Sequence, residues 1–244
     1  MKLIIDNGNS FTKLAIFNES ELVDLVSYSN FTLSDLQEIA KKYPQIEATI
    51  LSSVGKIDND IMDFLKSEYH FIELDHQTPV PFTIQYRTPE TLGKDRIAAV
   101  AALLGKYPDQ NALVIDAGTC ITYDLLTKDA IYIGGSISPG MEMRFKALNT
   151  YTARLPKLNY KEIDFLSGSS TEESILSGVL NGISAEIDGI IDAYRENYEI
   201  LTIILTGGDY IYFDKRLKNN IFALPNMVLE GLNIILDFNG KKLD

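Results

Sequence analysis

The sequence predicts an α/β protein built from two halves that share one topology. Strand-like and helix-like segments alternate along the chain, which is typical of helices layered on a sheet. A strand–turn–strand pattern at the start recurs 110 residues later, which indicates an internal duplication. The chain has 244 residues, of which 45% are hydrophobic and 23% charged, as expected for a globular protein of one large or two small domains.

The first half begins with two apolar segments, Lys2–Asp6 and Lys13–Phe17, that flank a polar turn. We expect them to form a strand pair, because Asn and Gly in that turn suit tight backbone geometry. The remaining segments alternate in type: helix at Leu33–Lys42, strand at Ala48–Ser53, helix at Asn59–Glu68 and strand at Phe71–Leu74.

A helix at Ile97–Leu104 and a polar stretch between Gly105 and Asn111 separate the halves, so we predict domains at residues 1–110 and 111–244. The second half contains strands at Ala112–Asp116 and Ile121–Leu126, a long helix at about Glu172–Asn197 and a late strand at Ile203–Thr206. Four residue pairs match between the halves: Asp6 with Asp116, Gly8 with Gly118, Asn9 with Thr119, and Thr12 with Thr122. Chance is the alternative, because Asp-x-Gly is common in turns.

Composition excludes several classes of protein. The formal charge of −12 argues against a nucleic-acid partner, since an acidic surface repels phosphate backbones. One cysteine and two histidines provide neither a disulfide nor a zinc cluster, which suits a reducing cytoplasm. Asp6 interrupts any signal-peptide core, and the apolar run Ile97–Leu104 is too short to span a bilayer. We therefore expect a cytoplasmic protein with no membrane partner.

Nucleotide chemistry is suggested by two turns and one pair of glycines. The sequence has neither a P-loop nor a Rossmann glycine motif. The first turn can cradle phosphate with its N–H groups, and Asp6 can hold hydrated Mg²⁺, although an ordinary hairpin with a polar tip is an equal alternative. The residues of this predicted phosphate turn are Asp6, Asn7, Gly8, Asn9, Ser10, Phe11, Thr12 and Lys13. The turn at Asp116–Thr119 would face it, and Gly207 and Gly208 would let an adenine ring lie against the backbone.

These features resemble the actin/hexokinase/Hsp70 superfamily, a duplicated ribonuclease H-like (actin-like ATPase) fold with ATP in a cleft between two domains. Within it the sequence is similar to the type III pantothenate kinases over nearly its whole length. The resemblance rests on five motifs in family order: Asp6-x-Gly8-Asn9-Ser10-x-x-Lys13, Gly93-Lys94-Asp95-Arg96, Asp116-x-Gly118-Thr119, Gly134-Gly135-Ser136-Ile137-Ser138-Pro139-Gly140 and Thr206-Gly207-Gly208. Three positions depart mildly from the family pattern: Ser10 stands where Thr is frequent, Cys120 where a small residue is common, and Lys94 at a variable position.

The resemblance implies transfer of the ATP γ-phosphoryl group to the primary hydroxyl of pantothenate. It makes Asp95 the expected general base, for which the alternative is a helix N-cap. The implied substrate residues are Tyr86, Gly93, Lys94, Asp95, Arg96 and Thr171, and the implied nucleotide residues include Thr119, Gly207 and Gly208. It also implies Mg²⁺ at Asp6 and a monovalent cation, K⁺ or NH₄⁺, at Asp116.

Gly178 and Gly182 leave a notch on the long helix, which serves either intrachain packing or a homodimer. Two alternative functions remain open on the same fold. One is another phosphotransferase, a sugar kinase or exopolyphosphatase. The other is a non-catalytic ATP-responsive regulator, against which the three carboxylates Asp6, Asp95 and Asp116 argue.

Overall fold

The computed structural model describes residues 1–240, which form two compact units. The first unit comprises Met1–Pro108, Ala130–Ile133 and the segment that starts at Asn226, and the second comprises Asp109–Asp129 and Gly134–Pro225. Each unit is a set of residues that contact one another more than they contact the rest of the chain. The predicted boundary between residues 110 and 111 is defined by the internal repeat instead, and it stays a prediction.

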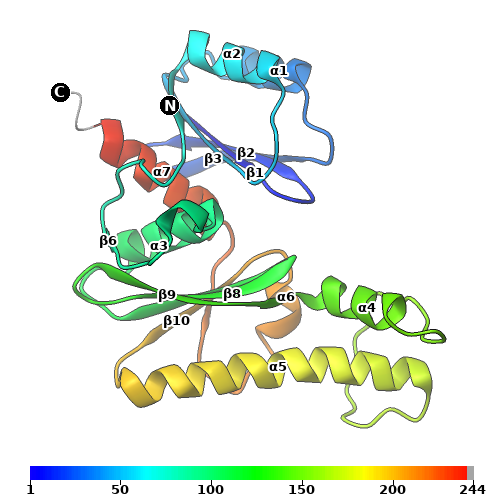
Figure 1. The fold of residues 1–244 in the computed structure, drawn as a ribbon. Coiled ribbons are helices and arrows are strands. Elements are labelled where there is room, and N and C mark those ends of the chain that lie inside the picture. The colour runs from blue at the N-terminus through cyan, green and yellow to red at the C-terminus, as the bar shows by residue number, and fades with distance from the viewer. Residues whose placement is uncertain (241–244) are drawn as a thin grey trace. The chain divides into compact units, whose positions relative to one another are not determined.

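The first unit contains a five-stranded sheet in the order β3-β2-β1-β4-β5 (Figure 1). Its strands are β1 (Lys2–Asn7), β2 (Thr12–Asn18), β3 (Glu21–Tyr28), β4 (Ala48–Ser53) and β5 (His70–Glu73). Strand β1 is antiparallel to β2 and parallel to β4, so it lies at the centre of the sheet. The other elements of this unit are α1 (Leu33–Lys42), α2 (Asn59–Glu68), β6 (Thr83–Ile84), η1 (Pro89–Thr91), α3 (Lys94–Lys106) and α7 (Met227–Gly240).

Helices cover both faces of this sheet. Leu36 of α1 and Ile61 of α2 are buried with Leu3, Ile5 and Leu51 of the central strands. On the other face α7 contacts β1 and β4, and α3 packs along α7. The alternation of strand side chains assigns Leu3 and Ile5 to the face of α1 and α2, and Ile4 and Asp6 to the opposite face. Asp6 therefore extends toward the side of the sheet that α3 and α7 cover.

The second unit contains the strands β11-β10-β7-β8-β9 of a six-stranded sheet. They are β7 (Ala112–Ala117), β8 (Cys120–Leu126), β9 (Ile131–Pro139), β10 (Thr202–Thr206) and β11 (Phe222–Ala223). The sixth strand, β6, pairs with Ile131 and Tyr132 at the start of β9. The helices of this unit are α4 (Met141–Thr150), α5 (Thr171–Asn197) and α6 (Tyr210–Phe213).

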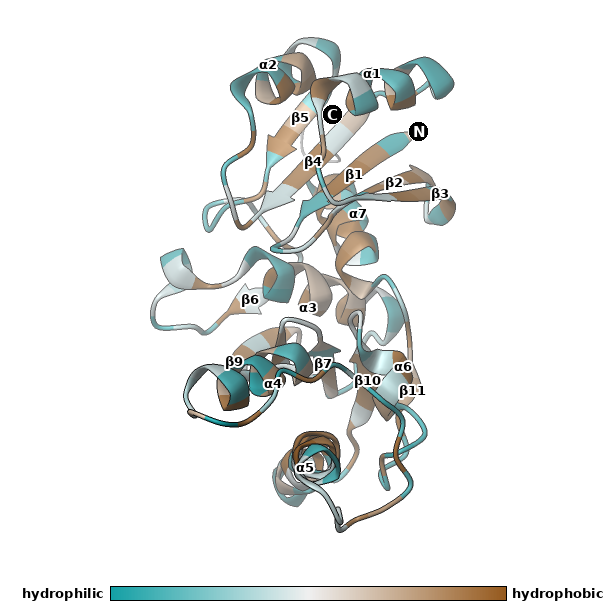
Figure 2. Cartoon of the chain, turned by 90° about the vertical axis from the view of Figure 1, so that its right-hand side faces the viewer, coloured by the Kyte–Doolittle hydropathy of each residue, from teal (hydrophilic) through white to brown (hydrophobic). Residues whose placement is uncertain are grey.

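Helix α5 runs along one face of the second sheet and supplies much of its core. Figure 2 looks along this helix and shows apolar residues on the side that faces the sheet. Within residues 1–240, α5 alone is long and apolar enough to cross a membrane, and half of its most apolar window is buried. A core helix of a soluble protein passes the same test, so the predicted absence of a membrane partner stays a prediction.

The two sheets repeat one topology. The order β3-β2-β1-β4-β5 in the first sheet corresponds to β9-β8-β7-β10-β11 in the second. In each sheet the central strand is antiparallel to the strand that follows it and parallel to the later crossover strand. Asp6 in β1 and Asp116 in β7 occupy equivalent positions near the ends of these central strands. The predicted duplicated α/β fold is therefore confirmed.

Candidate active site

The predicted phosphate turn is the hairpin that joins β1 to β2. The Gly8 N–H donates to the Phe11 carbonyl at 3.1 Å, which closes the turn. The Asn7 amide donates to Ser53 Oγ at 2.8 Å and accepts from Thr12 Oγ1 at 2.7 Å, so the base of the turn is anchored to β4. Asn7 and Thr12 thus hold the turn in place, whereas Asn9, Ser10 and Phe11 are exposed at its tip. A pocket of about 320 Å³, lined by residues 7–12 together with residues 29–31, 56–58 and 61, lies beside it.

Asp6 is a partly buried carboxyl in a perturbed electrostatic environment. Burial raises its pKa to about 6, the neighbouring Asp95 charge adds to that rise, and Lys13 opposes it. Lys13 stands opposite Asp6 in the β1–β2 register. The structure therefore brings the predicted metal ligand Asp6 close to the predicted base Asp95, although they are far apart in the sequence.

Asp95 lies in the first turn of α3, which begins at Lys94 with Gly93 as its N-cap. The expectation of a helix that starts at Ile97, with Asp95 as the alternative N-cap, is therefore wrong. The Asp95 carboxylate accepts the Arg96 N–H at 2.9 Å, a position where the helix dipole favours a negative charge. A Cβ on Gly93 would lie 2.5 Å from Asp95 Oδ1, so this carboxylate rests against the glycine. The Gly93-x-Asp95 spacing thus has a steric reason.

The other expected substrate residues of the first unit gather around this helix start. The Arg96 guanidinium carbon lies 5.8 Å from the centroid of the Tyr86 ring, and that ring stacks on Tyr132. Arg96 is buried, with 4% of its surface exposed. Lys94 Nζ lies 4.0 Å from the Glu73 carboxylate. Tyr86, Lys94, Asp95 and Arg96 therefore form one group.

The second turn, at residues 117–119, is packed between two glycines of the second unit. Gly207 has φ +94°, and a Cβ there would clash with the Ala117 carbonyl and with Asp116 Oδ1. Gly140 donates its N–H to the Thr119 carbonyl at 3.1 Å, and a Cβ on it would clash with the Gly118 and Thr119 carbonyls. Three predicted motifs of the second half therefore meet at this turn. Gly208 differs from Gly207 because a Cβ on it would meet nothing within 4 Å, which leaves room for a ring.

Thr171 lies in the second unit, apart in the sequence from the other expected substrate residues. It is the first residue of α5, where Ser170 is the N-cap and accepts the Glu173 N–H at 3.2 Å. Thr171 lines a cavity of about 940 Å³ whose wall also includes Arg144 and apolar residues of α4 and α5. A cavity of this size is in the range of small-molecule sites.

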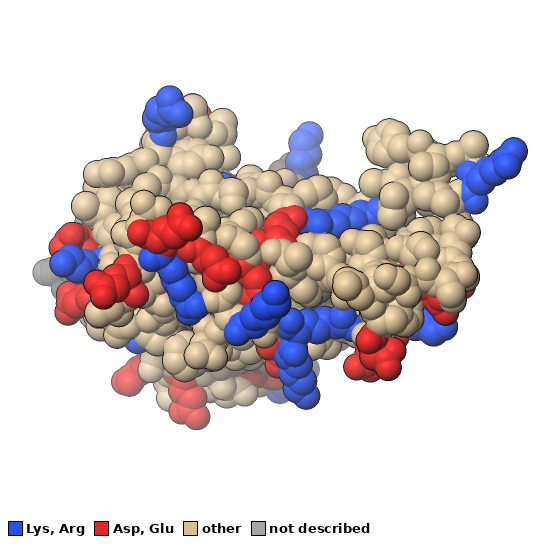
Figure 3. All heavy atoms as spheres, turned by 90° about the horizontal axis from the view of Figure 1, so that it is seen from below, with Lys and Arg blue, Asp and Glu red and all other residues tan. Residues whose placement is uncertain are grey.

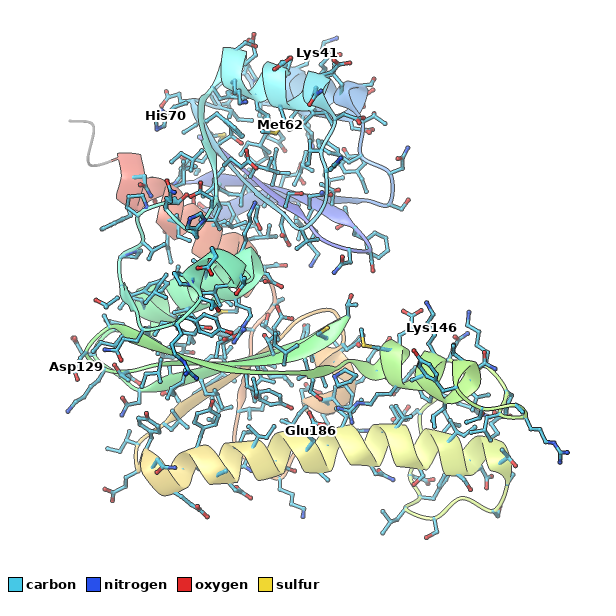
Figure 4. All side chains as sticks on the ribbon, viewed as in Figure 1. Lys41, Met62, His70, Asp129, Lys146 and Glu186 are labelled. Carbon is cyan, nitrogen blue, oxygen red and sulfur yellow. The ribbon has the colours of Figure 1, made fainter. Side chains whose placement is uncertain are left out.

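Sequence reasoning did not single out Asp209, Arg144 or Ser52. The Asp209 N–H donates to the Ala117 carbonyl at 2.8 Å, and burial, with Glu142 nearby, raises the Asp209 pKa to about 6. Arg144 donates to the Pro139 carbonyl at 2.8 Å and pairs with Glu186, which extends from α5 toward the sheet (Figure 4). Asp209 directly follows the glycine pair, so its position in the sequence was the one available signal.

Among residues 1–240, no three His, Cys, Asp or Glu side chains group as a metal site. A cation at Asp6 or Asp116 would therefore take its other ligands from backbone carbonyls, phosphate oxygens and water. Mg²⁺ is commonly held in this way, by one or two carboxylates and substrate phosphates. The residues present thus fit a cation that arrives with a nucleotide.

The chain is similar to known proteins over nearly its whole length. A family model described as type III pantothenate kinase matches residues 2–193. A type III pantothenate kinase of Christiangramia forsetii is 50% identical over 240 residues, covering 98% of this chain and 99% of that protein. One of Phocaeicola vulgatus is 48% identical over 242 residues, covering 99% of this chain and 100% of that protein.

Solved structures agree on the fold. A Campylobacter jejuni protein described as a putative Baf family transcriptional activator has a TM-score of 0.62 at 22% identity, covering 98% of this chain and 99% of its own. The activator of 2-hydroxyisocaproyl-CoA dehydratase from Clostridium difficile, with bound ADPNP, has a TM-score of 0.59 at 12% identity, covering 99% and 96%. At these identities the likeness shows the actin-like fold alone. The family model and the sequence relatives also show the family: the chain belongs to the type III pantothenate kinases.

Proposed function

We propose that this kinase, which phosphorylates pantothenate from ATP in coenzyme A biosynthesis, uses Asp95 as its general base and Asp6 to hold the divalent cation. The observation that carries these roles is the proximity of the two carboxylates within the first unit, where Asp95 helps to raise the Asp6 pKa. Two neighbouring carboxylates with different environments suit different tasks in one reaction.

Asp95 has the geometry of a base. One of its oxygens accepts the Arg96 N–H, which fixes the carboxylate at the start of α3 and leaves the other oxygen for a substrate hydroxyl. In the reaction the pantothenate hydroxyl gives its proton to Asp95 as its oxygen bonds to the γ-phosphorus. The bond from that phosphorus to the bridging oxygen of ADP breaks.

Asp6 suits a cation because its charge is poorly solvated. Burial raises its pKa, so a bound cation would relieve the cost of ionising this carboxyl. Mg²⁺ bound there would neutralise charge on the β- and γ-phosphates. The exposed tip of the turn, with the N–H groups of Asn9, Ser10 and Phe11, would hold the same phosphates, and Lys13 contributes a positive charge beside Asp6.

For pantothenate, Arg96 is the residue whose planar guanidinium suits a carboxylate, and Tyr86 offers an apolar face beside it. Gly93 and Lys94 complete this side of the site. Thr171 would contribute from the cavity at the start of α5.

For the nucleotide, Thr119 is assigned to the phosphates, and Gly207 and Gly208 to the adenine ring. Asp116 is assigned to a monovalent cation, K⁺ or NH₄⁺. Support comes from the second turn, where the Ala117 and Cys120 carbonyls lie near the Asp116 carboxylate, around Gly207 and Gly118. Carbonyl and carboxylate oxygens can replace the hydration shell of such a weakly hydrated ion.

The cellular setting follows from surface chemistry. On the face that carries α5, acidic and basic side chains are interspersed (Figure 3), and the net charge of the chain is −12. Both features support a cytoplasmic protein without a nucleic-acid or membrane partner.

Helix α5 also carries an exposed row of small residues, namely Gly178, Gly182, Ala185 and Gly189. Such a row permits close helix approach, which supports a homodimer.

A substrate screen tests these proposals. The enzyme is given ATP, Mg²⁺ and either K⁺, NH₄⁺ or Na⁺, with pantothenate, glucose or polyphosphate as the other substrate. We expect 4′-phosphopantothenate by mass spectrometry, with K⁺ or NH₄⁺ giving faster turnover than Na⁺. Equal rates in all three salts would contradict the monovalent site. Turnover of glucose or polyphosphate without turnover of pantothenate would contradict the substrate assignment.

A further inference from the structure

Ser52 in β4 is a buried serine whose hydroxyl is not used by the fold. Its side chain is 1% exposed, and its Oγ has no hydrogen-bond partner in the described part of the chain. Native proteins satisfy nearly all buried polar atoms, so an exception calls for a functional explanation.

The register of the first sheet places this hydroxyl beside Asp6. Strands β1 and β4 are parallel, with Asp6 opposite Ser52 and Asn7 opposite Ser53. Because side chains alternate between faces, Ser53 shares the face of Asn7, and it accepts the Asn7 amide at 2.8 Å. Ser52 shares the face of Asp6. It is near enough to lower the Asp6 pKa, against burial and Asp95, but it does not complete a hydrogen bond of ordinary geometry.

The second unit repeats this pairing. In the β7–β10 register Asp116 stands opposite Thr206, which is 2% exposed. Strand β10 has the place in the second sheet that β4 has in the first. Each repeat therefore sets a buried hydroxyl residue beside the carboxylate at the end of its central strand. Core packing alone gives no reason for a hydroxyl at both equivalent positions, where an apolar residue would avoid the cost of burial.

We propose that Ser52 is a positioning residue for the divalent cation: its hydroxyl donates to one Asp6 carboxylate oxygen and orients the other toward the cation that accompanies ATP. The proposal rests on the assignment of Asp6 as the cation ligand. Hydrogen bonds of this kind to a ligating carboxylate commonly change metal affinity by about 10- to 100-fold. Ser52 Oγ has no other hydrogen-bond partner that would compete for it.

The test measures nucleotide binding by calorimetry, with ATP in Mg²⁺ and with ATP in EDTA, on the full-length chain. Ser52→Ala removes the hydroxyl, and Ser52→Cys keeps a side chain of similar size that donates weakly. The matched control is Thr49→Val, since Thr49 is also in β4, is 0% exposed and has an unpartnered hydroxyl, but lies on the opposite face from Asp6.

We expect both Ser52 variants to bind ATP about 10-fold more weakly in Mg²⁺, and to bind it like the parent in EDTA. Without ligand, their thermal midpoints should not fall below that of the parent, because no hydrogen bond is lost. Thr49→Val should match the parent in all three measurements.

Three results would overturn the proposal: Mg²⁺-dependent binding by Ser52→Ala equal to that of the parent, the same loss in Thr49→Val, or a lowered thermal midpoint with unchanged binding. Asp6→Asn separates this failure from that of the metal assignment. If Asp6→Asn weakens Mg²⁺-dependent binding and Ser52→Ala does not, only the role of Ser52 is wrong. If neither variant weakens it, the assignment of Asp6 is wrong and the role of Ser52 fails with it.

Discussion

At the scale of single residues, a substitution of Asp95 should change catalysis without changing the stability of the fold. Asp95→Asn keeps an oxygen that can accept the Arg96 N–H, so the start of α3 should persist. It removes the basic carboxylate, so we expect kcat to fall by about 100-fold or more, with ATP affinity and thermal midpoint nearly unchanged. Steady-state kinetics and a thermal melt of the same preparation check this. A lowered melt with unchanged turnover per folded molecule would reduce Asp95 to a structural role.

Asp6 leads to a prediction about pH. Its pKa rises from 3.8 to about 6 in the folded chain, so between these values the folded state binds more protons than the unfolded state. The contribution of Asp6 to the free energy of unfolding is therefore fully present below about pH 3.8 and is lost as the pH rises through about 6. The loss amounts to at most about 3 kcal/mol. Asp6→Asn should raise the free energy of unfolding of the ligand-free protein at pH 7.5 by about 1–3 kcal/mol, and by little at pH 4.

Urea unfolding at both pH values measures this difference, and Asp24→Asn is the contrasting control. Hydrogen bonds from Lys42 and Tyr43 lower the pKa of Asp24, so its removal should reduce stability at pH 7.5 instead. Equal effects of the two substitutions would contradict the electrostatic account of Asp6.

At the scale of elements, two glycines predict different outcomes. A Cβ on Gly93 would meet the end of the Asp95 side chain at 2.5 Å, and that side chain can move. Gly93→Ala should therefore lower kcat by about 10-fold while stability changes by less than about 1 kcal/mol.

A Cβ on Gly140 would meet backbone carbonyls of the second turn, which cannot move alone. Gly140→Ala should therefore destabilise the fold by about 2 kcal/mol or more. Denaturant titration measures the stability of both variants, and steady-state kinetics measures their kcat. A larger loss of stability in Gly93→Ala than in Gly140→Ala would contradict this account of the packing.

The elements also show how far sequence reasoning extends. Helices α1 and α2 have the predicted bounds, because apolar spacing and polar flanks agree there. Strand β3 was not predicted, since the apolar residues Val23 and Leu25 are on its exposed face and hide the alternation with its half-buried face. Helix α7 was not predicted either, because Gly231 and Asn233 interrupt its apolar face although both are buried. Within the site, the polar turn pointed to Asp6 and the family resemblance pointed to Asp95, and both roles stay predictions. Only strand register, which depends on tertiary structure, distinguishes Ser52 from its neighbour Ser53.

At the scale of the whole molecule, duplication explains why predicted site residues occur in both units. Each unit contributes a central strand that ends in a carboxylate and a glycine-containing turn. The first unit adds the group around Asp95, and the second adds the glycine pair and Thr171. Each unit therefore carries its own set of predicted site residues, and the motifs on which the family resemblance rests are spread over both.

The same scale carries the prediction of a homodimer through α5. Ala185 lies in the exposed row of small residues on this helix, and an arginine there would block close approach of a second helix without entering the core. We expect the parent chain to sediment with twice the mass of one chain and Ala185→Arg with the mass of one, at unchanged helix content. Glu38→Arg on α1, an exposed charge change in the first unit, is the control and should keep the parent mass. If the parent is monomeric at micromolar concentration, or if Ala185→Arg keeps the doubled mass, the contact between copies does not use this face of α5. Activity measured on the monomeric variant then tells whether a second copy contributes to turnover or only to stability, because the cavity beside Thr171 lies at the N-terminal end of the same helix.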